Sequence, residues 1–160
     1  MSAQKSTLPA VIEIVSVEED GNSTEIVNIP KEGVNHYYLH VGAMGFGNKA
    51  ISVNLDPVDR LYVPLGSTLA EAISTMEELK TLYKEPKGTS REIQASFGPF
   101  LPKDSLKTVK VERYQPLLTN YIAFTLSYGG SERAAHLSKS EFNSLLSGLK
   151  LHKKLHPKEK

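Results

Sequence analysis

Aromatic and basic side chains alternate along the second half of this sequence. Single-stranded nucleic acids are bound by such mixtures, because cations follow the phosphates while flat rings stack on the bases. Stacking needs no sequence readout, since every base offers a flat face. The residues expected to make these contacts are Lys103, Lys107, Lys110, Arg113, Tyr114, Tyr121 and Arg133.

Strand alternation indicates which of these side chains share a surface. Ile122 and Phe124 have one parity and predict a buried face, so Tyr121 should point the other way. On the preceding predicted strand, Lys110 and Tyr114 share one parity. A sheet face carrying these three residues would form a binding platform. Tyrosine also favours strands for packing reasons alone, so a purely structural role stays open.

Charge is distributed unevenly between the two halves. Residues 1–80 hold five basic and eleven acidic side chains, a net charge of −6, whereas residues 81–160 hold fourteen basic and seven acidic ones, a net charge of +7. This asymmetry favours a surface in the second half that faces a polyanion. Attraction between the two halves, within one chain or head to tail between chains, explains the asymmetry equally well.

The sequence has no recognisable arrangement of catalytic residues. Gly42, Gly45 and Gly47 read G-x-x-G-x-G, which fits neither the P-loop nor the dinucleotide-binding pattern. Ser147 and Lys150 match S-x-x-K, but the companion motifs of that enzyme class are missing. We therefore expect a protein that is not an enzyme and that uses no cofactor.

Histidine spacing gives little support for a metal site. His36 and His40 lie on a predicted strand, where a separation of four residues is roughly 13 Å, too far to share an ion. His152 and His156 have helical spacing, but Pro157 follows, and a carboxylate at fitting spacing is not evident. We assign this pair to a basic tail that frays beyond Pro157 and expect no metal.

Several strands and two amphipathic helices should position these residues. Thr68 with Glu71, and Ser138 with Glu141, form capping boxes in front of apolar stripes at helical spacing. Gly148 lies inside the second stripe and should weaken that helix by about 1 kcal/mol relative to alanine. Alternating apolar residues predict strands at 11–17, 24–29, 36–41, 50–55, 61–63, 91–97, 107–114, 119–128 and 132–137.

The segment of residues 121–149 runs strand, glycine turn, strand and helix, and the stretch LSKSEFNSLL (residues 137–146) opens the helix. It resembles the C-terminal strand–turn–strand–helix unit of the Whirly and transcriptional-coactivator type of single-stranded-DNA-binding proteins. In that family a stretch of the form L-S-x-x-E/Q-F/W-x-x-L caps the helix. The resemblance implies a sheet that grips unpaired strands, often within an oligomer.

Length and composition bound the fold class. A chain of 160 residues without cysteine suits one domain without disulfides. No signal-peptide core is evident, and the apolar runs are too short to cross a bilayer. We expect a soluble cytoplasmic protein, in the host cytoplasm if it is viral, with no membrane partner. We predict an α+β fold that consists of one or more antiparallel sheets and two amphipathic helices. In each half of the chain the strands precede the helix.

The domain organisation has two interpretations. Residues 1–160 form a single compact domain with mobile ends, or residues 10–86 and 90–152 form two similar halves. The leading functional hypothesis is a sequence-nonspecific single-stranded-DNA-binding protein, of a kind that suits phage or viral replication and can form a homo-oligomer. The alternative is a protein–protein assembly or structural subunit that binds no nucleic acid.

Overall fold

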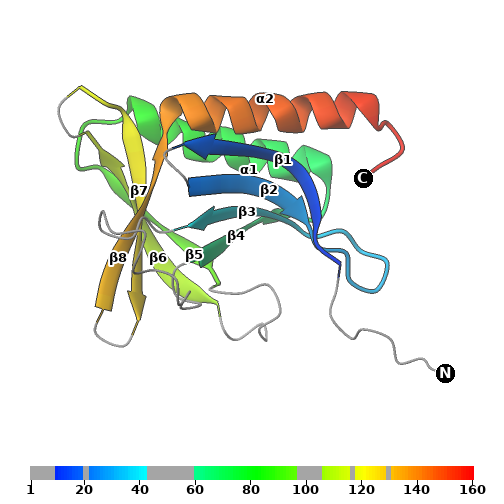
Figure 1. Cartoon of the computed structure of the whole chain (residues 1–160), viewed down its shortest axis with the longest axis horizontal. Helices are drawn as coiled ribbons and strands as arrows, with labels where there is room; N and C mark the ends of the chain where they lie inside the picture. The colour runs from blue at the N-terminus through cyan, green and yellow to red at the C-terminus, as the bar shows by residue number, and fades with distance from the viewer. Residues whose placement is uncertain (1–9, 20–21, 43–59, 97–105, 116–117, 129–130) are drawn as a thin grey trace.

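Two runs of four strands, each followed by a helix, make up the part of the chain that the structure describes (Figure 1). The structure is a computed structural model that describes residues 10–19, 22–42, 60–96, 106–115, 118–128 and 131–160. It confirms the predicted α+β class, with strands before the helix in each half. The elements are β1 (Ile12–Glu19), β2 (Asn22–Asn28), β3 (Tyr37–Gly42), β4 (Arg60–Gly66), α1 (Leu69–Lys80), a 3-10 turn (Thr81–Lys84), β5 (Ser90–Ala95), β6 (Lys107–Tyr114), β7 (Tyr121–Tyr128), β8 (Ser131–Ser138) and α2 (Lys139–Leu155).

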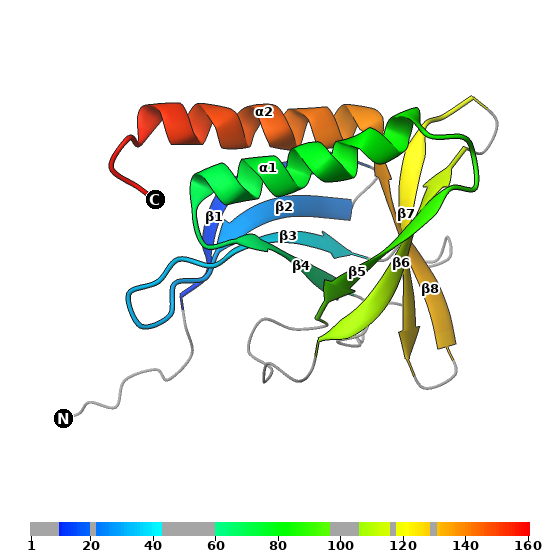
Figure 2. The same cartoon turned by 180° about the vertical axis from the view of Figure 1, so that it is seen from behind.

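Each run of strands forms an antiparallel meander, in the orders β1-β2-β3-β4 and β5-β6-β7-β8. The two sheets meet where Tyr62 and Ser96 exchange backbone hydrogen bonds of 2.8 and 3.0 Å. Figures 1 and 2 show α1 and α2 side by side over one face of the first sheet, while the second sheet crosses near one end of the helices. One face of each sheet therefore turns inward.

A single cluster of buried apolar side chains runs through both halves. Leu39 and Val63 contribute to it from the first sheet, and Val111 and Phe124 from the second. Met76 of α1 lies in the same cluster and is fully buried. Because apolar residues alternate along these strands, each sheet sends one parity into this core and presents the other parity on its opposite face.

The two helix starts differ in detail. At α2, Ser138 and Glu141 form the complete predicted capping box, with each side chain bonded to the other residue's backbone N–H. At α1, Thr68 caps the Glu71 N–H as expected. The carboxylate of Glu71, however, accepts from the N–H of Ser67, at 2.9 Å, so it reaches back one residue further than in a capping box.

Gly148 lies where α2 crosses the edge strand β1. A Cβ at this position would lie 2.5 Å from Cγ2 of Val15. Such a distance is far inside van der Waals contact, so the close approach of helix and strand requires glycine here. The packing contact explains why a residue that weakens helices occupies the middle of α2.

The chain beyond Pro157, expected from the sequence to fray, lies against the rest of the protein. The hydroxyl of Tyr37 donates to Glu159 Oε2 at 2.6 Å, and the N–H of Leu69 donates to the backbone oxygen of Lys160 at 2.7 Å. These contacts join the C-terminal residues to β3 and to the start of α1. The predicted strand at 50–55 lies outside the described residues.

Candidate nucleic-acid interface

Three ring-bearing residues gather on the face of the second sheet that points away from the core. In the strand register, Tyr114 of β6 is opposite Tyr121 of β7, and His136 of β8 is opposite Ala123. Within their own strands Tyr121 alternates with the buried Ile122, His136 with the buried Leu137, and Tyr114 has the parity opposite to the buried Val111, so they share the outer face. We call Tyr114, Tyr121 and His136 the aromatic cluster.

The rings of the aromatic cluster contact one another. The centroid of the His136 imidazole lies 5.0 Å from that of Tyr114, with 20° between the planes, and 5.8 Å from that of Tyr121. Tyr114 is 37% exposed, while Tyr121 and His136 are half-buried. Burial lowers the pKa of His136 below its ordinary value, so the imidazole is neutral at pH 7. The cluster therefore presents uncharged rings to solvent.

Lys110 is the basic residue that the structure places on the same outer face. Its ammonium lies 3.3 Å from the carboxylate of Glu112, and both side chains are partly exposed. Glu92 of β5 is directly opposite Lys110 in the register. This part of the outer face thus combines one cation with two carboxylates, so the local charge is less positive than the composition of the second half suggests.

Arg113, which we predicted as a surface cation, lies on the inner face. It is 8% exposed, its Nε donates to the backbone oxygen of Tyr83 at 3.0 Å, and its Nη1 donates to Gln115 at 3.2 Å. The reason is its parity, which it shares with the core residues Val109 and Val111. We therefore correct its role: Arg113 ties β6 to the 3-10 turn after α1.

Three other predicted cations fall outside the aromatic cluster. Lys107 is exposed but has the inner-face parity, opposite the buried Ala95. Arg133 has the parity of the buried Ala135, and its side chain lies outside what the structure describes. Lys103 lies outside the described residues altogether. Of the seven predicted residues, the structure places Lys110, Tyr114 and Tyr121 on one outer face, and of these Tyr114 and Tyr121 are directly opposite each other.

Two further lysines flank the cluster and were missed by sequence reasoning. Lys87 precedes Gly88, whose N–H bonds the Arg113 oxygen at 3.0 Å next to Tyr114. Lys139 follows the strand β8, and its N–H bonds the Asn120 oxygen at 3.0 Å next to Tyr121. Neither lysine belongs to a predicted strand, so alternation could not have indicated them. His136 was also missed, although its parity within the predicted strand at 132–137 places it on the outer face.

A shallow surface depression begins at Lys139 and follows α2. It is open to solvent and lined by residues of polar type, and two of them, Lys139 and Asn143, are half-buried. The side-chain oxygens of Asn143 and of Asn120 are buried and have no hydrogen-bond partner among the described residues. The depression is lined by Lys139, Ser140, Asn143, Ser144 and Ser147.

The first sheet carries a second group of rings on its own outer face, formed by Tyr38, His40 and Tyr62. The rings of His40 and Tyr62 stack with 4.1 Å between centroids, and Tyr38 meets Tyr62 edge-on at 6.1 Å. His40 is 6% exposed, and its Nδ1 lies 2.9 Å from Glu25. This group is more enclosed than the aromatic cluster. Tyr38 points outward, whereas its neighbour Tyr37 is buried.

No family model, no curated protein and no solved structure matched this chain.

Proposed function

We propose that the chain binds single-stranded nucleic acid, DNA in the first place, without sequence specificity and through the outer face of β6, β7 and β8. The observation that carries this proposal is the aromatic cluster, in which three rings meet on a sheet face and Tyr114 remains open to solvent. The strand–turn–strand–helix unit that the Whirly-type resemblance concerns is formed by β7, β8 and α2.

Stacking supplies most of the affinity in this account. Each base that stacks on an aromatic side chain contributes about 1–3 kcal/mol, whatever its sequence. Tyr114 offers the most exposed ring, and Tyr121 of β7 and His136 of β8 lie beside it. Rings already held against one another lose little conformational freedom on binding, which favours a preorganised platform.

Phosphate contacts contribute less to the affinity for single strands than they would in a strongly basic protein. Lys110 shares its charge with Glu112, and Lys87 and Lys139 stand at the sides of the cluster. Three phosphate contacts by these lysines give a slope of roughly −2 for log affinity against log salt, since each contributes about −0.7 on single strands. The proposal therefore predicts a modest salt dependence.

The test is fluorescence anisotropy of a labelled oligo-dT titrated with wild type, Tyr114→Ala and Tyr114→Phe at low salt. We expect Tyr114→Ala to bind roughly 5- to 150-fold more weakly and Tyr114→Phe to bind like wild type, because phenylalanine keeps the stacking surface. The aromatic substitution is the matched control for the loss of the hydroxyl. No binding by wild type at low salt would contradict the proposal.

The edge strand β1 favours a second function, self-assembly. Among the described strands β1 pairs with β2 alone, and Val11 and Ile12 at its start are exposed apolar residues. An open apolar edge pairs readily with a second copy of the same strand across a two-fold axis. Sedimentation velocity tests this: a dimer that Ile12→Lys dissociates would support it, and a monomer at every concentration would count against it.

A further inference from the structure

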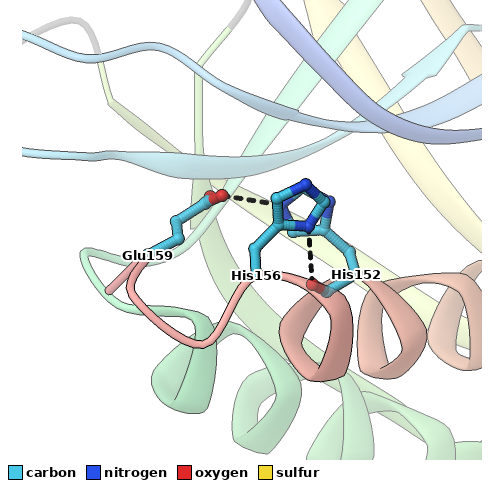
Figure 3. A group of neighbouring side chains, drawn as sticks. All are labelled: His152, His156 and Glu159. Atoms are coloured by element: carbon cyan, nitrogen blue, oxygen red, sulfur yellow. Dashed lines mark hydrogen bonds and ion pairs between the residues drawn. The ribbon is translucent and has the colours of Figure 1, made fainter.

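The end of α2 and the residues after it bring two imidazoles and a carboxylate together (Figure 3). His152 lies in the last turns of α2, and His156 follows one turn later, with its ring stacked 4.2 Å from the first. Glu159 returns toward both rings. The candidate ligand atoms of these three residues all lie within 4.8 Å of one another.

The carboxylate corrects the sequence interpretation of this segment as a tail without a fitting acidic residue. Glu159 Oε1 lies 2.7 Å from His152 Nε2, across a spacing of seven residues. This spacing is two helical turns, but Pro157 interrupts the helical pattern between the two residues, so we did not connect them from the sequence. The bend at Pro157, which ends the helix, is what allows the glutamate to approach the histidines.

The donor set selects a class of ion. Two imidazoles and one carboxylate suit borderline transition metals, whereas calcium and magnesium prefer oxygen ligands alone. Three protein ligands with one open position is the arrangement of many non-structural zinc sites. The ligand atoms of tetrahedral zinc lie roughly 3.4 Å apart, given bonds of about 2.0–2.1 Å. A small rearrangement of the three side chains, of which His156 is exposed and the other two are half-buried, would therefore close the cluster around an ion.

We propose that His152, His156 and Glu159 bind a divalent transition-metal ion, with zinc as the expected metal. His152 Nε2, His156 Nε2 and one oxygen of Glu159 are the ligand atoms. The ion takes the place of the His152–Glu159 hydrogen bond and leaves one coordination position to water. The proposal is independent of nucleic-acid binding.

The surroundings of the three residues are those of a supported metal site. His156 Nδ1 lies 3.0 Å from the backbone oxygen of His152, which orients the ring with Nε2 free to coordinate. The hydroxyl of Tyr37 donates to Glu159 Oε2 at 2.6 Å, and Asn35 in turn donates to that hydroxyl at 3.2 Å. Tyr37 is 1% exposed and fixed within β3, so its hydroxyl is a rigid anchor for the carboxylate.

The position of the site indicates what the ion would do. Glu159 and Lys160 join the chain after α2 to β3 and to the first residue of α1. An ion held by His152, His156 and Glu159 would fasten this segment to the end of α2. Because such a site exists only in the folded chain, metal binding would stabilise the fold.

The experiment is isothermal titration of tag-free protein with zinc chloride, followed by the visible spectrum of the cobalt-loaded form, which reports coordination geometry. We expect one ion per chain, a tetrahedral cobalt spectrum and a melting temperature that rises with zinc. His156→Gln and Glu159→Gln should abolish all three. His36→Gln removes a histidine outside the cluster and should bind zinc like wild type. Tyr37→Phe keeps the buried ring and should weaken binding about 10- to 100-fold.

Two results would overturn the proposal. One is the absence of zinc binding by wild type, and the other is equal binding by wild type, His156→Gln and Glu159→Gln. An unchanged affinity of Tyr37→Phe for zinc would show that the hydroxyl of Tyr37 does not anchor the carboxylate. Each variant is first compared with wild type by its melting temperature without metal, so that a loss of binding is not confused with a loss of folding.

Discussion

His136 and Tyr114 stack across an intervening strand, with 5.0 Å between their ring centroids. The two residues belong to β8 and β6, and β7 lies between them. The stack is possible because Ala123, opposite His136 on β7, has a small side chain that the rings can cover. The aromatic surface on the outer face of the second sheet therefore depends on the small side chain of Ala123 as well as on the rings themselves.

The ion pair of Lys110 with Glu112 should limit the affinity for nucleic acid. Glu112→Gln releases the lysine and removes a nearby negative charge, so we expect a gain of up to about 1 kcal/mol, or fivefold, in affinity for oligo-dT. Lys110→Gln should weaken binding and make the salt slope less negative by about 0.7. Titrations over a range of salt measure both. A decrease in affinity with Glu112→Gln would contradict this account of the face.

Arg113 should affect the stability of the fold and leave nucleic-acid binding unchanged. Arg113→Met leaves the backbone oxygen of Tyr83 without its partner, which costs about 1–3 kcal/mol in the free energy of unfolding. Lys107→Met, at an exposed position of the same strand, should change it by less than about 0.5 kcal/mol. Urea unfolding measures the difference. If Arg113→Met instead unfolds like wild type and loses oligo-dT binding, the residue is a surface cation after all.

The pH dependence of stability should carry a contribution from His136. Burial holds the pKa of this imidazole below the ordinary value of 6.5, so the unfolded chain binds the proton more readily. This contribution is complete above pH 6.5 and is lost as the pH falls through the lower pKa of the folded state. Urea unfolding between pH 7.5 and 5 should show a shallower loss of stability in His136→Gln than in wild type. An imidazole resonance of His136 that titrates above pH 6.5 would contradict the sign.

Gly148 should not tolerate alanine, although alanine is the better helix former. The gain in helix propensity is about 1 kcal/mol. The new methyl group meets Val15, and overpacking of this kind costs about 1–3 kcal/mol. We expect Gly148→Ala to leave the free energy of unfolding unchanged at best and to lower it by up to about 2 kcal/mol. Adding Val15→Ala to the Gly148→Ala variant removes the clash and should recover part of the gain in helix propensity. If the effects of the two substitutions on the free energy of unfolding are simply additive, the contact with Val15 is not the cause.

Local patterns in the sequence predicted most of the elements, because each depends on neighbouring residues. The strand at 107–114 has the predicted bounds, since alternation there is regular, and Ser138 with Glu141 marks the start of α2. The inward position of Arg113 could also have been predicted, because its parity is that of Val109 and Val111.

Features that depend on tertiary contacts were not predictable. The stack of Tyr114 with His136 requires the pairing of three strands, which no local pattern specifies. The meeting of Glu159 with His152 requires the turn after α2 and the hydroxyl of Tyr37 on β3, a residue more than a hundred positions earlier in the chain. The sequence indicates residue types at these sites, while their distances come only from the fold.

The most direct test of the proposed interface is to titrate isotope-labelled protein with oligo-dT and to map the resonances that change by NMR. Binding on the outer face of the second sheet predicts the largest shifts at Tyr114, Tyr121 and His136, with small effects at Tyr38 and along β1. Shifts centred on β1 or on the first sheet, or none at all, would contradict it.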